Sequence, residues 1–166
     1  MGQNKQAGTL DELYKLLDDF DTVMLVTVTQ SGQLHARPMQ LQDRSKIPDC
    51  DLWFVTASDT AKVGDINWDH EVNVCCLRSS DKAYLSIAGY AEIETDPSLI
   101  QKLYQQEWKI WMGDDAAQSA AIIRLTIERA EYWEPEGGRA RILYEMLKGA
   151  VTGEAASKKL NPPKEI

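Results

Sequence analysis

Histidine and cysteine are scarce in this chain of 166 residues, which contains 2 histidines and 3 cysteines. Neither His35 nor His70 has a second ligand at a useful spacing, so a metal site is not expected. Cys75 and Cys76 are adjacent, Cys50 stands alone, and no Cys-x-x-Cys motif occurs. An odd, unpatterned set of cysteines favours reduced thiols in a cytoplasmic protein.

Long apolar runs and excess positive charge are also lacking. No stretch of about 18 apolar residues is present, so no membrane span is expected, and residues 1–5 lack the apolar core of a signal peptide. Lysine and arginine number 18 against 26 aspartates and glutamates, which gives a net charge of −8. This balance argues against a nucleic-acid backbone or an anionic membrane as the main partner. A small anionic ligand held by a few local cations remains possible.

Hydrophobic residues make up 43% of the chain. They suffice for the core of one domain, which we expect over residues 1–150, followed by a mobile tail over 151–166. Apolar residues at helical spacing predict helices over 10–19, 60–68, 96–111 and 139–147. Alternating and β-branched runs predict strands over 22–29, 34–42, 52–56, 71–77, 83–94 and 121–133.

Several of these six strands are separated by short turns and are therefore predicted to form hairpins, which favours an antiparallel sheet. Closure into a small barrel would remove the exposed edges of that sheet. Gly89 lies in the middle of the strand over 83–94, where it suggests a bend, a bulge or a close approach by another group. The expected fold is therefore mainly β, with helices at the periphery.

The stretch from residue 52 to residue 66 combines features of a phosphate site. An apolar strand is followed by a turn with hydroxyl groups at Thr56 and Thr60, and then by a helix with Lys62 in its first turn. Free N–H groups, the helix dipole, the hydroxyls and the ammonium group all favour an anion. The same residues also fit an ordinary helix cap with an exposed lysine, and this alternative stays open.

Arg37 lies within the strand over 34–42, where a charged side chain is costly unless it is paired or meets an anion. If this strand neighbours the strand over 52–56, Arg37 can meet Lys62 and Thr60 at one anion. The alternative is that Arg37 is half of a salt bridge within the sheet.

Four motifs then fall in the order and spacing of a known family: Ala36-Arg-Pro-Met39, Leu52-Trp-Phe-Val-Thr56, Thr60-Ala-Lys62 and Tyr84-Leu-Ser-Ile-Ala-Gly89. Over residues 10–135 the chain resembles the FMN-binding split barrels related to pyridoxamine 5′-phosphate oxidase. Within them it is most similar to the bacterial general stress protein 26 group. That group shares the Trp-Phe-x-Thr strand, a late tryptophan-rich segment and a closing Ala-Glu-Tyr-Trp, here residues 130–133.

The resemblance implies a six-stranded antiparallel split β-barrel that forms a homodimer, with two FMN molecules at the subunit interface. The positions that hold the FMN phosphate match Arg37, Thr60 and Lys62. The strand segments along the isoalloxazine ring match Pro38, Met39, Val55 and Thr56, and a polar residue near the ring matches Tyr84. The resemblance further suggests that Trp108 or Trp111 comes from the partner subunit, although both tryptophans also fit the core side of an amphipathic helix.

The chain departs from the oxidase pattern at three points. Ala61 stands where the oxidases have a second phosphate-binding arginine, and Gln42 stands where a lysine helps to hold pyridoxal phosphate. The C-terminal Trp…Arg-Leu-x-Pro signature is absent. Oxidation of vitamin B6 is therefore not expected, and FMN binding is expected to be weaker than in the oxidases.

No nucleophile–base pair or paired-carboxylate site stands out, which fits a flavoprotein whose hydride chemistry belongs to its cofactor. The expectation is an FMN-binding stress protein that acts as a flavin-dependent oxidoreductase on an unknown small substrate. Two alternatives stay open: a flavin-binding buffer or sensor without turnover, and a split barrel that binds haem or a deazaflavin.

Overall fold

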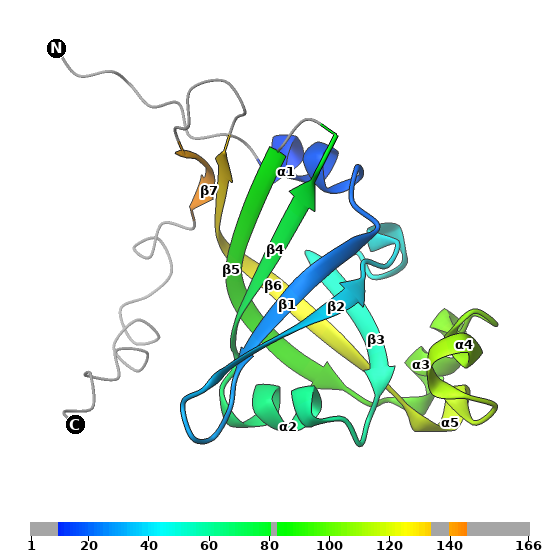
Figure 1. Cartoon of the computed structure of the whole chain (residues 1–166). Helices are drawn as coiled ribbons and strands as arrows, with labels where there is room; N and C mark the ends of the chain where they lie inside the picture. Colours follow the sequence, from blue (N-terminus) through cyan, green and yellow to red (C-terminus); the bar gives the residue numbers. More distant parts are fainter. Residues whose placement is uncertain (1–9, 81–82, 134–139, 146–166) are drawn as a thin grey trace, which may run out of the picture.

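The computed structural model describes residues 10–80, 83–133 and 140–145. Within these residues seven strands form one antiparallel sheet, in which hydrogen bonds connect the strands in the order β2-β1-β4-β5-β6-β3 and β7 pairs with β6. The strands are β1 (Thr22–Val28), β2 (Leu34–Gln40), β3 (Leu52–Ala57), β4 (Glu71–Arg78), β5 (Ala83–Glu94), β6 (Ala120–Trp133) and β7 (Ala140–Glu145). Figure 1 shows this sheet curled into an open barrel. The predicted mainly β split barrel is confirmed.

Short helices surround the barrel. They are α1 (Leu10–Leu17), the 3₁₀ turn η1 (Arg44–Lys46), α2 (Ala61–Trp68), α3 (Pro97–Leu103), α4 (Trp108–Met112) and α5 (Ala116–Ser119). In Figure 1, α1 and α2 lie at opposite ends of the barrel, and α3, α4 and α5 gather beside the end of β3. Within the described residues no helix has the length and apolar character needed to cross a membrane.

The strand order ends at β2 on one side and at β3 on the other, and these two ends approach each other across the opening of the barrel. Just beyond β2, the backbone N–H of Gln42 donates to the carbonyl of Trp53 in β3 at 3.3 Å. The ends of the two strands are therefore close together, although the strands are not paired along their length.

Two apolar cores fix the elements around this opening. Alternate residues of the strands, such as Leu25, Phe54 and Ile87, fill the interior of the barrel. The opposite face of β3 and β6 packs against α3, α4 and α5 in a second core that contains Trp53 and Trp108. Because α4 is anchored in this second core, it is held at a fixed place beside β3.

Two helix predictions were wrong. The helix expected over 96–111 is split into α3 and α4, because Tyr104 adopts an extended conformation (φ −53°, ψ 136°). The break lets Leu103 and Trp108 both reach the second core. The helix expected over 139–147 is instead the strand β7, which covers the edge of β6 beyond the point where β3 ends. An unpaired sheet edge outweighs helix propensity here. Residues 134–139 and 146–166, which include the tail predicted over 151–166, lie outside the described residues.

Gly89 marks a bulge, as its position in the strand suggested. The pairing of β5 with β6 shifts register between Ala88 and Gly89. A Cβ atom on Gly89 would lie 2.4 Å from the backbone oxygen of Thr126. The close approach of the two backbones therefore requires glycine at this position.

Candidate ligand pocket

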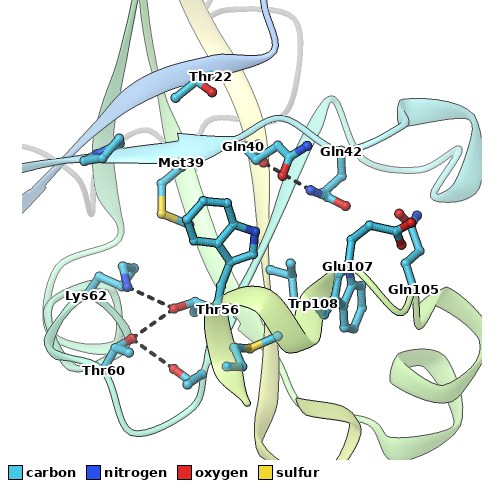
Figure 2. Close-up of a pocket in the computed structure, with 15 residues that line it drawn as sticks. Thr22, Met39, Gln40, Gln42, Thr56, Thr60, Lys62, Gln105, Glu107 and Trp108 are labelled. Carbon is cyan, nitrogen blue, oxygen red and sulfur yellow. Dashed lines mark hydrogen bonds between the residues drawn. The ribbon is translucent and has the colours of Figure 1, made fainter. Parts of the chain in front are cut away.

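A pocket of about 380 Å³ lies where β2, β3, the start of α2 and the α3–α4 turn meet. Small-molecule sites in proteins commonly have volumes of about 300–1,000 Å³. The lining residues are Thr22, Pro38, Met39, Gln40, Gln42, Val55, Thr56, Ala57, Thr60, Lys62, Gln105, Glu107, Trp108, Trp111 and Met112. Figure 2 shows their side chains.

The structure brings eight of the ten residues predicted for the cofactor into this one pocket. They are Pro38, Met39, Val55, Thr56, Thr60, Lys62, Trp108 and Trp111. Arg37 and Tyr84 do not line it. Sequence reasoning missed the polar residues Gln40, Gln105 and Glu107, which belong to none of the four motifs and lie at the end of β2 and in the turn between α3 and α4.

One end of the pocket carries an ammonium group and two hydroxyls. Lys62 Nζ donates to Thr56 Oγ1 at 2.9 Å, and the hydroxyls of Thr56 and Thr60 lie 3.2 Å apart. Thr60 is the N-cap of α2, yet its side chain makes no capping hydrogen bond. Its hydroxyl donates to the carbonyl of Ala57 at 2.9 Å instead. The geometry therefore differs from an ordinary hydroxyl cap, and Figure 2 shows these groups gathered together.

The ammonium group of Lys62 is electrostatically unsatisfied. Burial lowers the pKa of Lys62 below its ordinary value of 10.5, and the nearby positive charge of Arg37 lowers this pKa further. Within the described part of the chain, Lys62 makes no ion pair. Both causes of the lowered pKa would be offset by an anion bound beside Lys62.

Arg37 lies outside the pocket lining and pairs with Asp65 of α2. Nη2 of Arg37 is 3.1 Å from Oδ2 of Asp65, and Nη1 donates to the Thr27 hydroxyl and to the carbonyl of His35. The geometry thus contains the salt bridge that was the alternative reading of Arg37. The charge of Arg37 nevertheless acts on Lys62 through the pKa effect.

The wall beside the polar end is apolar and aromatic. Met39 and Trp108 are buried, Val55 is half-buried, and Trp111 is exposed at 76% of its surface. The indole Nε1 of Trp108 is buried and, within the described residues, has no hydrogen-bond partner. A buried donor without a partner is costly, and a hydrogen-bond acceptor that reached this N–H would remove that cost.

Tyr84 does not line the pocket and lies at the start of β5. It is opposite Leu77 of β4 and Trp133 of β6, and 47% of its surface is exposed. A single chain therefore does not bring Tyr84 to the pocket, and its role near a ring stays a prediction.

An open antiparallel barrel with a pocket between the two end strands of its strand order is typical of a split barrel. The family model described as pyridoxamine 5′-phosphate oxidase like matches residues 8–157. The chain belongs to this family.

The individual relatives share only a modest sequence identity with this chain. The protein bli-3 of Neurospora crassa is 27% identical over 171 residues, which cover 95% of this chain and 80% of bli-3. A Clostridium acetobutylicum protein related to general stress protein 26 of Bacillus subtilis has a similar structure. Its TM-score is 0.66 at 18% identity, over 82% of this chain and 94% of that one.

Similar structures differ in the ligand named for them. A pyridoxamine 5′-phosphate oxidase-related, FMN-binding protein of Nostoc punctiforme has a TM-score of 0.61 at 14% identity, over 78% of this chain and 85% of that one. The haem storage protein HutZ of Vibrio cholerae has a TM-score of 0.53 at 12% identity, over 71% of this chain and 89% of that one. At these identities the likeness shows a shared fold.

Proposed function

We propose that the pocket binds FMN, with the phosphate beside Lys62 and the isoalloxazine ring along the apolar wall. The observation that carries this proposal is a half-buried ammonium group at one end of an apolar pocket, next to two hydroxyls and with no acidic partner among the described residues. A phosphate needs cations and donors, whereas a flat ring needs apolar and aromatic surfaces. FMN joins both requirements in one molecule.

The residues of the pocket divide between these two parts of the cofactor. Thr56, Thr60 and Lys62 would hold the phosphate. Arg37, while it stays paired with Asp65, would act on the phosphate through its charge alone. Pro38, Met39, Val55, Trp108 and Trp111 would line the ring, and the unpartnered N–H of Trp108 would donate to one of its acceptors.

Bound FMN would supply hydride or electron transfer, so the protein would act as a cytoplasmic flavin-dependent oxidoreductase on a small substrate. The free cysteines Cys50, Cys75 and Cys76 support a reducing compartment. Gln42 lines the pocket at the place where the oxidases have a lysine, which supports a substrate other than a vitamin B6 phosphate. Neither histidine lines the pocket, so haem would lack its common axial ligand there.

The outer face of the sheet supports assembly into a homodimer. Met24, Leu77 and Tyr84 are exposed on this face, and the strand register places Met24 beside Pro38 and Cys75. Contiguous exposed apolar residues mark interaction surfaces. A second copy of the chain that covers this face would bury them and would bring Tyr84 into the interface.

The first test is the visible absorption spectrum of the purified protein before and after addition of FMN, followed by gel filtration. Flavin bands near roughly 375 and 450 nm that elute with a dimer are the expected result. Alanine at both Arg37 and Lys62 should abolish retention of the colour, whereas alanine at both Arg44 and Lys102, which lie outside the pocket, should not. A protein that stays colourless refutes the proposal.

Turnover separates the enzyme from a flavin buffer or sensor. The FMN-loaded protein should consume NADH or NADPH steadily in the presence of an electron acceptor. Retained flavin without any such consumption would favour the protein that binds FMN and does not turn over.

A further inference from the structure

The two ends of the pocket differ in charge. Lys62 is the one positively charged side chain among the described lining residues, and it lies with Thr56 and Thr60. On the side away from Lys62, Figure 2 shows the amide and carboxylate side chains of Gln40, Gln42, Gln105 and Glu107. Their formal charge is −1, and they come from the end of β2 and from the α3–α4 turn.

The polar groups at this second end are free to bind a ligand. Gln42 Nε2 donates to the backbone carbonyl of Gln40 at 3.3 Å, which leaves the Gln42 side-chain oxygen as an acceptor. Within the described part of the chain, the side chains of Gln105 and Glu107 make no hydrogen bond. Glutamine offers both donors and acceptors, whereas an ionised glutamate offers acceptors alone. The set therefore offers both donors and acceptors, carries one negative charge and contains no cation.

We infer that these four residues form a substrate subsite for an uncharged or cationic group with N–H or O–H donors, and that this subsite disfavours carboxylates and phosphates. The inference rests on the proposed FMN site, because Lys62 would then be occupied by the cofactor phosphate. An anionic substrate would meet Glu107 and no compensating cation. An amide or protonated nitrogen would find acceptors at Gln42, Gln105 and Glu107.

Three aromatic probes of nearly equal size test this charge preference: benzamidinium, benzamide and benzoate. Each is titrated into the FMN-loaded protein, and binding is followed by the perturbation of the flavin absorption spectrum. We expect benzamidinium and benzamide to bind at least about fivefold more tightly than benzoate. Equal affinity for the three probes, including a failure of all three to bind, would overturn the inference.

Substitutions in the subsite should reverse the preference. Gln42→Lys should strengthen benzoate binding relative to benzamide by about tenfold. Glu107→Lys, at an exposed position where folding is not at risk, should act in the same direction. Gln106→Lys is the matched control, because Gln106 is exposed in the same turn and does not line the pocket. Equal effects of Gln42→Lys and Gln106→Lys would overturn the inference.

The affinity for FMN, measured first for each variant, separates this inference from the proposed function. If Gln42→Lys and Glu107→Lys change FMN affinity and leave the probe preference unchanged, the four residues hold the cofactor itself and the substrate subsite is wrong. A wild-type protein that binds no FMN would remove both proposals together.

Discussion

Arg37 and Asp65, which lie outside the pocket lining, form an ion pair with 3.1 Å between Nη2 and Oδ2. The two side chains expose only 18% and 11% of their surface. The fully buried Thr27 hydroxyl donates to Asp65 at 2.7 Å and accepts from Arg37. The pair joins β2 to α2. It also offsets part of the charge of Arg37, although this charge still lowers the pKa of Lys62, which lines the pocket.

Asp65→Asn should therefore change anion binding and stability in opposite directions. The amide keeps the size of the side chain but leaves the charge of Arg37 uncompensated near Lys62. FMN should bind about three- to tenfold more tightly, with a steeper decrease in affinity as salt is added. The free energy of unfolding should fall by about 1–3 kcal/mol, because a mostly buried charge loses its partner. Flavin fluorescence titrations at two salt concentrations and urea unfolding measure these effects.

Asp18→Asn provides the control for this prediction. Asp18 pairs with Arg44 at 2.9 Å, but 70% of the Asp18 side chain is exposed. Its loss should change stability by less than about 0.5 kcal/mol and leave FMN affinity unchanged. Unaltered FMN affinity and salt dependence in Asp65→Asn would show that Asp65 does not influence the phosphate end.

Lys62 should make FMN binding depend on alkaline pH. Burial, and then the charge of Arg37, lower the pKa of Lys62 below 10.5 in the free protein. An adjacent phosphate would raise this pKa, so affinity should fall as pH rises through the lowered value in the free protein, before 10.5 is reached. Dissociation constants for FMN measured between pH 7 and pH 10.5 test this expectation.

Lys62→Arg should remove the pH dependence, because the guanidinium group stays protonated throughout this range. Lys62→Met should remove it as well, with an affinity for FMN weaker by at least about tenfold at pH 7. A decline that persists in both variants would assign the titration to another group.

Trp108→Phe should separate the indole N–H from the aromatic ring. The N–H of Trp108 is buried and has no partner within the described residues, so its removal gives up no hydrogen bond in the free protein. The smaller ring should cost about 1–2 kcal/mol of stability through lost packing. FMN affinity should fall by about tenfold if the N–H donates to the flavin.

Trp111→Phe is the control, because Trp111 is largely exposed and keeps an aromatic face at the pocket. Equal losses of FMN affinity in the two variants would contradict a specific role for the Trp108 N–H.

The strands and most of the candidate pocket could be predicted because their signals are local. The motifs around Met39, Thr56 and Lys62 each lie within one short segment, and the barrel brings these segments together. Arg37 could not be placed as well, because its partner Asp65 lies 28 residues away. The strand β7 was missed because its structure depends on the open edge of β6, which no local pattern reveals.

Leu77→Glu should split the proposed homodimer. Leu77 exposes 58% of its surface opposite Tyr84, so a charge there should leave the fold of one chain intact while opposing burial in an interface. Analytical ultracentrifugation should detect a monomer. The thermal stability of the variant at low concentration should equal that of the wild-type chain at the same concentration. Ile110→Glu is the control, since Ile110 is 74% exposed on α4, which contacts β3 and α5 and lies on a different part of the molecule from Leu77. A Leu77→Glu protein that sediments as the wild type does would rule out this face as the interface.

Gly89→Ala should destabilise the barrel without touching the pocket. The new Cβ atom would lie 2.4 Å from the Thr126 backbone oxygen and 2.9 Å from Leu125 Cδ2, and neither the backbone nor the packed side chain can move freely. We expect a loss of about 2–3 kcal/mol in the free energy of unfolding, measured by urea denaturation.

Gly64→Ala is the matched control, because Gly64 lies within α2 and a Cβ atom there meets nothing within 4 Å. Alanine favours helix, so this variant should gain about 0.5–1 kcal/mol. If both glycines tolerate alanine equally, the close approach of β5 to β6 at the bulge is not what requires glycine.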